Sequence, residues 1–336
     1  MKLRGGVGAA PLLLLLASCS GWQSVLDPKG PAADELARLI WSFTILCALI
    51  WVLVMIVLAI ALVRRRQPRP EPLAVDAAGD RRAHRVVSLA VVLTAFVLVG
   101  LTLLTFFANR TLAHIGTQAA VTITVTGHQW WWEVRYEDAR PDRVVTSANE
   151  IHVPAGKPIE IVLSSTDVIH SLWVPNLAGK LDLIPGRENV LRFVAAEPGT
   201  YRGQCAEFCG AQHAHMALVV VAEPPAAFEA WRDRQLQSAT APIAGEPTAG
   251  RDVFLGRGCI LCHRVRGTPA GGNTGPDLTH LASRLTLAGG TLEMSRGNLA
   301  AWIADPQGIK PGVHMPVFGL GGDELNEVVA YLERLE

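Results

Sequence analysis

Two long stretches without a formally charged residue constrain the fold of this chain more than any other feature of its sequence. Leu39–Val63 is 25 residues long and Val86–Ala108 is 23 residues long, and neither contains a formally charged side chain. A helix needs about 20 apolar residues to cross the roughly 30 Å hydrocarbon core of a bilayer. Charged residues make up 18% of the chain, below the share of about 25% that is usual in soluble proteins. The sequence therefore predicts a two-helix transmembrane hairpin, assigned to residues 36–110.

The segment between the two stretches is rich in arginine. Loops with an excess of Lys and Arg stay on the cytoplasmic side of the membrane. This loop is therefore predicted to be cytoplasmic, which puts both ends of the protein outside. We expect a multi-pass protein of a bacterial inner membrane with periplasmic domains. The arginines of the loop are Arg64, Arg65, Arg66, Arg69, Arg81, Arg82 and Arg85.

The first residues are typical of an export signal of the bacterial lipoprotein type. Lys2 and Arg4 precede an apolar run, Val7–Ala17, that is too short to span a bilayer. Small residues then lead to Cys19, as in the cleavage box whose cysteine becomes the lipidated first residue of the mature chain. We expect residues 1–18 to be removed and Cys19 to carry lipid. An ordinary signal peptide with an incidental cysteine is the alternative.

Charge and cysteine usage narrow the class of partner and cofactor. Lys plus Arg equal Asp plus Glu at 30 each, so the chain has no excess positive charge to neutralise phosphates, and a nucleic-acid partner is not expected. Six cysteines are too few for a disulfide scaffold. Four of them form two close pairs, which favours cofactor chemistry.

The part of the chain after the second stretch has the pattern of an all-β domain. Val121–Thr126 alternates between valine or isoleucine and threonine, and Ile159–Leu163 and Ala217–Ala222 are further β-rich runs. Gly and Pro punctuate the intervals. Residues 117–223 are therefore predicted to form a β-sandwich or barrel.

A second external domain is predicted to be helical. Pro225–Leu236 has helical character, and Ser238–Ala249 is rich in Ala, Pro, Thr and Gly, so we assign residues 224–249 to a short helix and linker. Residues 250–336 then form a domain of short helices and long Gly/Pro loops. It ends in Gly322–Leu335, where apolar residues recur at helical spacing.

Soft metal ligands are concentrated in one twelve-residue segment. Cys205, Cys209, His213, His215 and Met216 bring two thiols, two imidazoles and a thioether together. Sulfur with imidazole suits copper, and a thioether argues against a structural zinc site. Two thiolates suggest more than one metal ion. A disulfide between the two cysteines is the alternative in an exported protein, but the imidazole and thioether that follow disfavour it.

Cys259, Cys262 and His263 form the CxxCH signature of covalent haem attachment. The two thiols form thioethers to the porphyrin, and the adjacent imidazole ligates the iron. The second axial ligand is either Met315 or Met294, with His280 and His314 as weaker candidates. We favour Met315 because it is followed by proline and precedes the terminal helix.

The order of these motifs resembles subunit II of the haem-copper cytochrome c oxidases. The resemblance covers the two membrane spans and the cysteine loop. It also covers three further segments: Gly127–Trp132 with the sequence GHQWWW, His170–Pro175 with HSLWVP, and Pro185–Arg187 with PGR.

The resemblance implies a binuclear CuA site in a cupredoxin barrel. Two bridging cysteines, two histidines, a methionine and one backbone carbonyl hold the coppers in that family. It also implies that the Glu207 carboxylate helps to hold a magnesium ion against the catalytic subunit. The implied copper ligands are His170, Cys205, Cys209, His213, Met216 and the carbonyl of Glu207.

The aromatic run contains one residue with an implied function. In the family, the tryptophan at the position of Trp130 lies at the surface above CuA and relays electrons from the donor. Trp131 and Trp132 are interpreted as core or membrane-interface residues. His128 and His152 are interpreted as structural.

The whole order of lipoprotein signal, hairpin, CuA domain, linker and cytochrome c domain is similar to the fused caa-type oxidases. The implied fold is a multidomain membrane protein with a two-helix transmembrane hairpin, an all-β cupredoxin-like barrel and an all-α class I cytochrome c domain. The implied function is electron entry, from haem c to CuA and on to subunit I, where dioxygen is reduced to water and protons are pumped. The implied partners are subunits I and III, membrane lipid, and an external donor such as a cytochrome c or a bc complex.

Other functions stay open at this point. A CuA-containing nitric oxide reductase subunit would use the same electron-entry parts, and a membrane-anchored electron-carrier or copper-delivery lipoprotein would act without a catalytic partner. A quinol oxidase subunit typically lacks the copper ligands, which are complete here. The chain also departs from many relatives, because no glutamate stands at the cytoplasmic entrance of the second span. Asp80 or His84 is the candidate for that proton-entry role.

Overall fold

The structure is a computed structural model that describes residues 20–64, 77–115, 118–239 and 248–336. Contacts divide the chain into two compact units. One combines the described part of Met1–Asp34 with Ile115–Glu336, and the other is Glu35–His114. The expected lipidation site at Cys19, three of the loop arginines and most of the linker lie outside the described residues.

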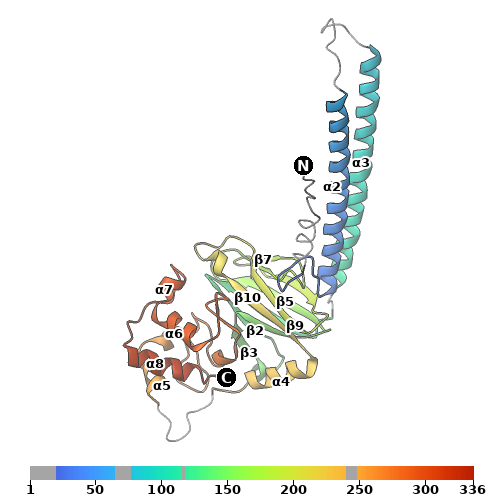
Figure 1. Cartoon of the computed structure of the whole chain (residues 1–336). Coiled ribbons are helices and arrows are strands. Elements are labelled where there is room, and N and C mark those ends of the chain that lie inside the picture. Colours follow the sequence, from blue (N-terminus) through green and yellow to red (C-terminus); the bar gives the residue numbers. More distant parts are fainter. Residues whose placement is uncertain (1–19, 65–76, 116–117, 240–247) are drawn as a thin grey trace, which may run out of the picture. The chain divides into compact units, whose positions relative to one another are not determined.

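Two long helices make up the second unit (Figure 1). Helix α2 (Pro31–Val63) and helix α3 (Ala77–His114) have mean hydropathies of 3.2 and 2.7 over their most apolar windows, and none of those windows is buried. Side chains this apolar are stable in lipid rather than in water. Both helices extend beyond the predicted limits of 36 and 110, because helical hydrogen bonding continues past the uncharged core of each span.

The first external domain is a sandwich of two five-stranded sheets. One has the order β3-β2-β1-β5-β8, in which β1 pairs parallel with β5 and antiparallel with β2. The other has the order β4-β10-β9-β6-β7. The strands are β1 (Val121–His128), β2 (Trp131–Tyr136), β3 (Val145–Ala148), β4 (Glu150–Pro154), β5 (Pro158–Ser165), β6 (His170–Trp173), β7 (Leu181–Leu183), β8 (Asn189–Val194), β9 (Gly199–Cys205) and β10 (Ala217–Glu223).

Alternating burial explains how these strands form a two-layer core. In β1, Ile123 and Val125 are fully buried while the threonines that alternate with them are partly exposed, as expected for a strand with one face on the core. The three β-rich runs predicted from the sequence correspond to β1, β5 and β10. Helix α4 (Pro225–Gln235) then buries Phe228 and Trp231, and the ring of Trp231 lies 5.1 Å from that of Tyr136 in β2.

The second external domain is mainly helical. Its first and last helices approach so closely that a Cβ added at Gly250 would lie 1.9 Å from the Glu327 carbonyl oxygen. Only glycine permits this crossing. A short antiparallel pair, β11 (Thr286–Leu287) with β12 (Leu292–Glu293), interrupts the expected all-α pattern. The helices are α5 (Ala249–Gly256), α6 (Arg296–Ala304), α7 (Pro306–Ile309) and α8 (Gly322–Leu332), with 3-10 turns η3 (Cys259–Leu261) and η4 (Leu281–Ser283).

Candidate metal and haem centres

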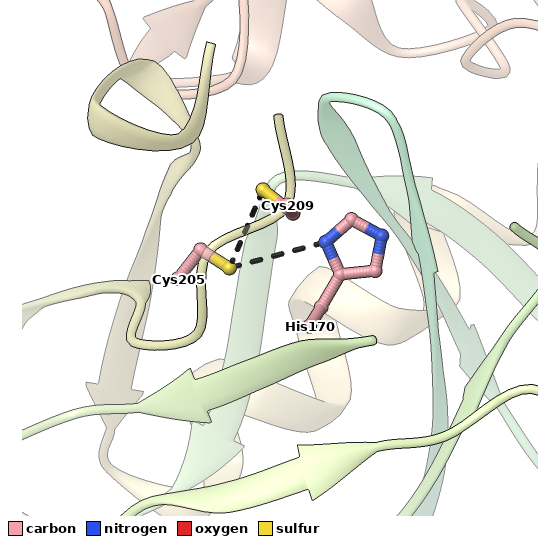
Figure 2. Close-up of side chains that lie close together, drawn as sticks. All are labelled: His170, Cys205 and Cys209. Carbon is pink, nitrogen blue, oxygen red and sulfur yellow. Dashed lines mark hydrogen bonds between the residues drawn. The ribbon is translucent and has the colours of Figure 1, made fainter. Parts of the chain in front are cut away.

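The six donors that the family resemblance assigns to copper converge at one end of the sandwich. Cys205 Sγ lies 3.8 Å from Cys209 Sγ and 3.9 Å from His170 Nδ1, as Figure 2 shows. The same sulfur lies 3.1 Å from the Glu207 carbonyl oxygen. Cys209 Sγ is in turn 3.7 Å from His213 Nδ1 and 3.8 Å from Met216 Sδ.

Neighbouring strands explain why donors 46 positions apart in the sequence meet. His170 begins β6 and Cys205 ends β9, and these strands pair antiparallel with Leu172 opposite Cys205. The loop after β9 then brings Cys209 and His213 back over the same end before Met216 leads into β10. The site therefore depends on strand pairing for one imidazole and on a short loop for the other donors.

The His170 imidazole is fixed from two sides. Its Nε2 lies 2.9 Å from Asp167 Oδ1, which orients Nδ1 towards the two sulfurs. A carboxylate behind a ligating imidazole fixes the tautomer and ring orientation. On the other side, a Cβ at Gly127 would lie 2.6 Å from His170 Cδ2, so the ring packs directly on the β1 backbone. Asp167 was not identified from the sequence, because a loop carboxylate three residues before a histidine carries no distinctive pattern.

The two thiols are strongly coupled through their proximity. The hydrogen bond with Cys209, followed by that with His170, lowers the pKa of Cys205 far below its usual value despite burial. The Cys205 thiolate raises the pKa of Cys209, and burial adds to the effect. Such a pair loses its first proton easily and its second with difficulty. A bound cation would favour loss of both protons, so the pair suits a metal centre with two bridging thiolates.

Trp130 lies against the copper loop but is not at the surface. Its indole Nε1 donates to the Cys209 carbonyl oxygen at 2.9 Å, and the Gln129 side-chain amide donates to the same oxygen at 2.8 Å. The side chain is 7% exposed. The expected surface position is therefore wrong for this chain, because the haem domain covers the indole: the His314 ring centroid lies 6.0 Å away.

A cavity of about 260 Å³ in the helical domain brings the predicted haem ligands together. Cys259, Cys262, His263 and Met315 all line it. Trp130 lines the same cavity from the β-domain. Its other walls are mainly apolar, as expected of a porphyrin pocket; they include Phe254, Leu278, Leu281, Leu299, Trp302, Ile303, Val328 and Leu332.

The proximal imidazole is oriented by the backbone. His263 Nδ1 donates to the Pro276 carbonyl oxygen at 2.8 Å, which leaves Nε2 free to bind iron. Burial lowers the pKa of His263, so the ring stays in the neutral form that a metal requires. A Cβ at Gly275 would lie 2.9 Å from His263 Cε1, so the chain approaches the ring as closely as glycine permits.

The candidates for the second iron ligand differ in whether they line the cavity. Met294 packs against the apolar core of the helical domain, and His280 uses both ring nitrogens in contacts with Glu336 and Gln237. Met315 lines the cavity. His314 lines it too, next to Trp130.

An unpaired buried group shows that the cavity also suits the polar edge of a haem. Arg284 lines the cavity and is 8% exposed, and its Nε has no hydrogen-bond partner among the described residues. A buried guanidinium N–H without a partner is costly. The carboxylate groups of a porphyrin would supply the acceptor.

The remaining candidates do not join either centre. His152 lies between Glu150 Oε1 at 2.8 Å and Glu223 Oε2 at 3.1 Å, consistent with a structural role. Trp132 is fully buried in the core. The Glu207 side chain is exposed, and the sole cluster of three His, Cys or acidic ligands within the described ranges is the copper group. The magnesium expected at Glu207 therefore has no support from this chain.

Both external domains match known protein families. Residues 139–223 match the family model described as cytochrome c oxidase subunit II, periplasmic domain, and residues 247–336 match the cytochrome c model. Cytochrome c oxidase subunit 2 of Alkalihalophilus pseudofirmus is 33% identical over 97% of this chain and 95% of its own length. The chain belongs to the cytochrome c oxidase subunit II family.

Other subunit II proteins match over similar lengths. The cytochrome c oxidase subunit 2 of Bacillus subtilis is 28% identical over 96% of this chain and 95% of its own length. Among solved structures, the periplasmic domain of subunit II of a cytochrome oxidase from Bradyrhizobium japonicum is 32% identical. The match covers 36% of this chain and 96% of the solved chain, with a TM-score of 0.34.

Membership in the subunit II family gives the general role of this chain. It is a membrane protein with external domains and part of an oxidoreductase complex of the haem-copper type. Its subunit II domain implies CuA, its cytochrome c domain implies haem c, and its role is electron transfer.

Proposed function

We propose that this chain is the electron-entry subunit of a respiratory haem-copper oxidase. It accepts electrons in its cytochrome c domain, passes them through Trp130 to its copper site, and delivers them to subunit I. There dioxygen is reduced to water, coupled to proton pumping. Each bound centre would supply reversible one-electron chemistry.

The position of Trp130 carries the proposal. Its indole lines the haem cavity and also donates to the carbonyl of Cys209, a proposed copper ligand. One buried side chain therefore links the two proposed centres. An electron carrier or copper-delivery protein that acts alone would not need this link between a haem cavity and a copper loop.

The chain's own residues have distinct roles in this function. Cys259 and Cys262 would anchor the haem, and His263 and Met315 would ligate its iron. A thioether opposite an imidazole raises the potential of a haem, which suits a carrier that feeds a strong oxidant. The copper would be held by His170, Cys205, Cys209, His213, Met216 and the carbonyl of Glu207.

Several expectations extend beyond the described structure. We propose subunits I and III as partners and an external cytochrome c or bc complex as the donor. Lipid on Cys19, magnesium at Glu207, and proton entry at Asp80 or His84 stay predictions from the sequence.

Truncation tests the proposed direction of electron flow. A chain that ends after Ser238 lacks the cytochrome c domain but keeps every proposed copper ligand. We expect the complex assembled with it to retain the copper spectrum and to turn over only with added cytochrome c or a small reductant. In the full-length complex, reduction of CuA should be independent of protein concentration, because the entry domain is part of the same chain. Equal turnover of the truncated complex with the native donor, at the same rate, would contradict the proposal.

A further inference from the structure

One lysine of the cytochrome c domain is buried against the copper domain. Lys310 follows α7 and is 1% exposed. Its Nζ donates to three backbone carbonyls: those of Trp130 at 3.0 Å, His215 at 2.9 Å and Ala288 at 2.9 Å. In the described part of the chain no carboxylate pairs with it. Burying an ammonium group is costly unless all its protons are bonded, and here three donors meet three acceptors.

The three acceptors tie specific segments together. Trp130 is the proposed electron relay, and His215 lies between the proposed copper ligands His213 and Met216. Ala288 belongs to the cytochrome c domain itself. A single ammonium group thus joins the relay, the copper loop and the haem domain. Separation of the haem domain from the copper domain would break the two bonds that cross between them, to Trp130 and to His215.

A glycine turn completes the contact around this lysine. Ala217 N donates to the Gly289 carbonyl oxygen at 2.8 Å, directly after the copper ligand Met216. Gly289 and Gly290 have φ values of 67° and 75°. This left-handed backbone conformation strains residues that carry a side chain, and glycine adopts it readily. A Cβ at Gly290 would lie 2.8 Å from the Cβ of Ala217, so the two domains approach at backbone distance.

Further hydrogen bonds surround the same contact. Gln212 Nε2 donates to the Pro311 carbonyl at 2.7 Å, and Leu285 N donates to Glu150 Oε2 at 2.8 Å. Backbone groups and buried side chains make most of these bonds. Such a contact differs from the salt-screened surface pairs of a transient encounter between carriers.

We propose that Lys310 is a positioning residue that fixes the cytochrome c domain on the copper domain, so that electron transfer occurs in one docked geometry. This inference rests on the proposed function for its electron-transfer part. Its docking part stands on the contacts alone. The linker then limits how far the domain can separate, while Lys310 and the glycine turn set the working geometry.

Hydrogen exchange in the full-length complex tests the docking part. Lys310→Met keeps the length of the side chain but removes its three donors. We expect the amides of Ala217 and Leu285, which bond across the contact, to exchange about tenfold faster or more. Amides inside β5 should not change. Lys157→Met, at an exposed lysine, is the matched control and should leave all of these rates unaltered. Unaltered exchange in Lys310→Met would overturn the proposal.

A second variant covers the case in which Lys310→Met fails to fold. Gly290→Ala places a methyl group against Ala217 and should raise exchange at the same two amides. Gly156→Ala is its control, because Gly156 has a similar φ of 72° but no atom within 4 Å of its added Cβ. Equal exchange in the two glycine variants would show that backbone strain, and not a lost contact, is responsible, and would overturn the proposal.

Flash reduction of haem c in the same samples tests the positioning part. We expect transfer to CuA to slow by about tenfold or more in Lys310→Met, since small misplacements of reacting groups have large effects on rate. The haem potential and the copper EPR spectrum should stay as in the unaltered complex, which a general loss of structure would not allow. Faster exchange with an unchanged transfer rate would overturn the positioning role. Failure of the proposed function would be distinct: the truncated complex would turn over normally, whatever the exchange rates.

Discussion

The indole N–H of Trp130 donates a hydrogen bond of 2.9 Å to the carbonyl oxygen of Cys209. This bond joins the wall of the haem cavity to the loop that holds the proposed copper ligands. Gln129 donates to the same oxygen, so the loop is supported by two neighbouring side chains. Because Gln129 would still support the loop if Trp130 were replaced, a substitution at Trp130 can test electron transfer apart from the structure of the copper loop.

Trp130→Phe should slow transfer from haem c to CuA without removing copper. Phenylalanine fills most of the buried space but has no N–H group, while Gln129 still supports the Cys209 carbonyl. We expect a decrease of about tenfold or more in the transfer rate after flash reduction, with an unchanged copper EPR spectrum. Trp131→Phe is the control, because Trp131 also lines the cavity but its ring stacks on His128 at 4.4 Å, whereas Trp130 bonds to the copper loop. A similar decrease in both variants would argue against a specific relay.

Cys205→Ser should abolish the binuclear copper spectrum. Two bridging thiolates allow one unpaired electron to be shared by two coppers, and serine cannot replace the soft sulfur ligand. The copper-loaded chain should be purple and give a mixed-valence EPR signal distributed over two equivalent coppers. A four-line signal from a single copper in the unaltered chain would refute the assignment.

Met315→Ala should lower the haem potential while the haem stays covalently attached. The thioether is lost as a ligand, but Cys259 and Cys262 are untouched. Because 59 mV is a tenfold change in a one-electron equilibrium, a drop of about 150 mV would favour transfer to CuA by more than about a hundredfold. Redox titration of the haem band measures the change. Met294→Ala should leave the potential unaltered, and the reverse pattern would make Met294 the ligand.

Gly127→Ala should disturb the copper site through a single methyl group. The added Cβ would lie 2.6 Å from the His170 ring, which is fully buried. We expect a shifted CuA absorption and weaker copper retention against a chelator. Gly271→Ala has no atom within 4 Å of its added Cβ and should retain both properties. An unaltered spectrum in Gly127→Ala would show that the ring has room to adjust.

His152 should make the stability of the copper domain depend on pH. Burial lowers the pKa of His152, but its hydrogen bonds to Glu150 and Glu223 outweigh that effect and leave the pKa above 6.5. A raised pKa contributes stability that is complete below the unfolded value near 6.5 and is lost as pH rises through the folded value. The difference in thermal unfolding midpoint between the unaltered chain and His152→Asn should therefore shrink with rising pH.

His128→Asn provides a control of opposite sign for that measurement. Burial lowers the pKa of His128 below 6.5, so its protonation on acidification opposes folding. The difference in midpoint between the unaltered chain and this variant should widen as pH rises. The same trend with pH in both histidine variants would contradict the pKa assignments.

Local sequence was sufficient to predict most of the chemistry. Cys205, Cys209, His213 and Met216 lie within twelve residues, and Cys259 to His263 is a five-residue signature. Donors this close along the chain share a site in almost any compact fold. His170 is 35 residues before the first cysteine, and only the resemblance to a family, not its spacing, indicated it. The pairing of β6 with β9 is what brings it into contact.

Residues that act through long-range contacts could not be predicted in the same way. Asp167 is an ordinary loop carboxylate until strand pairing places it behind His170. The family resemblance places Trp130 at the surface, and nothing in its own segment indicates that a second domain covers it. Lys310 is the clearest case: a lysine after a short helix is usually solvated, and its burial appears only when the two external domains are in contact.

The sequence by itself determined the two membrane spans, the order of the domains and the two short clusters of candidate ligands, 205–216 and 259–263. Hydropathy and ligand chemistry depend on residue type and short-range spacing, so they can be read along the chain. The tertiary structure decided how the donors converge, which methionine lines the haem cavity, and how Lys310 joins that domain to Trp130. Those features depend on contacts between residues up to 180 positions apart. Packing and burial set such contacts, and no local pattern encodes them.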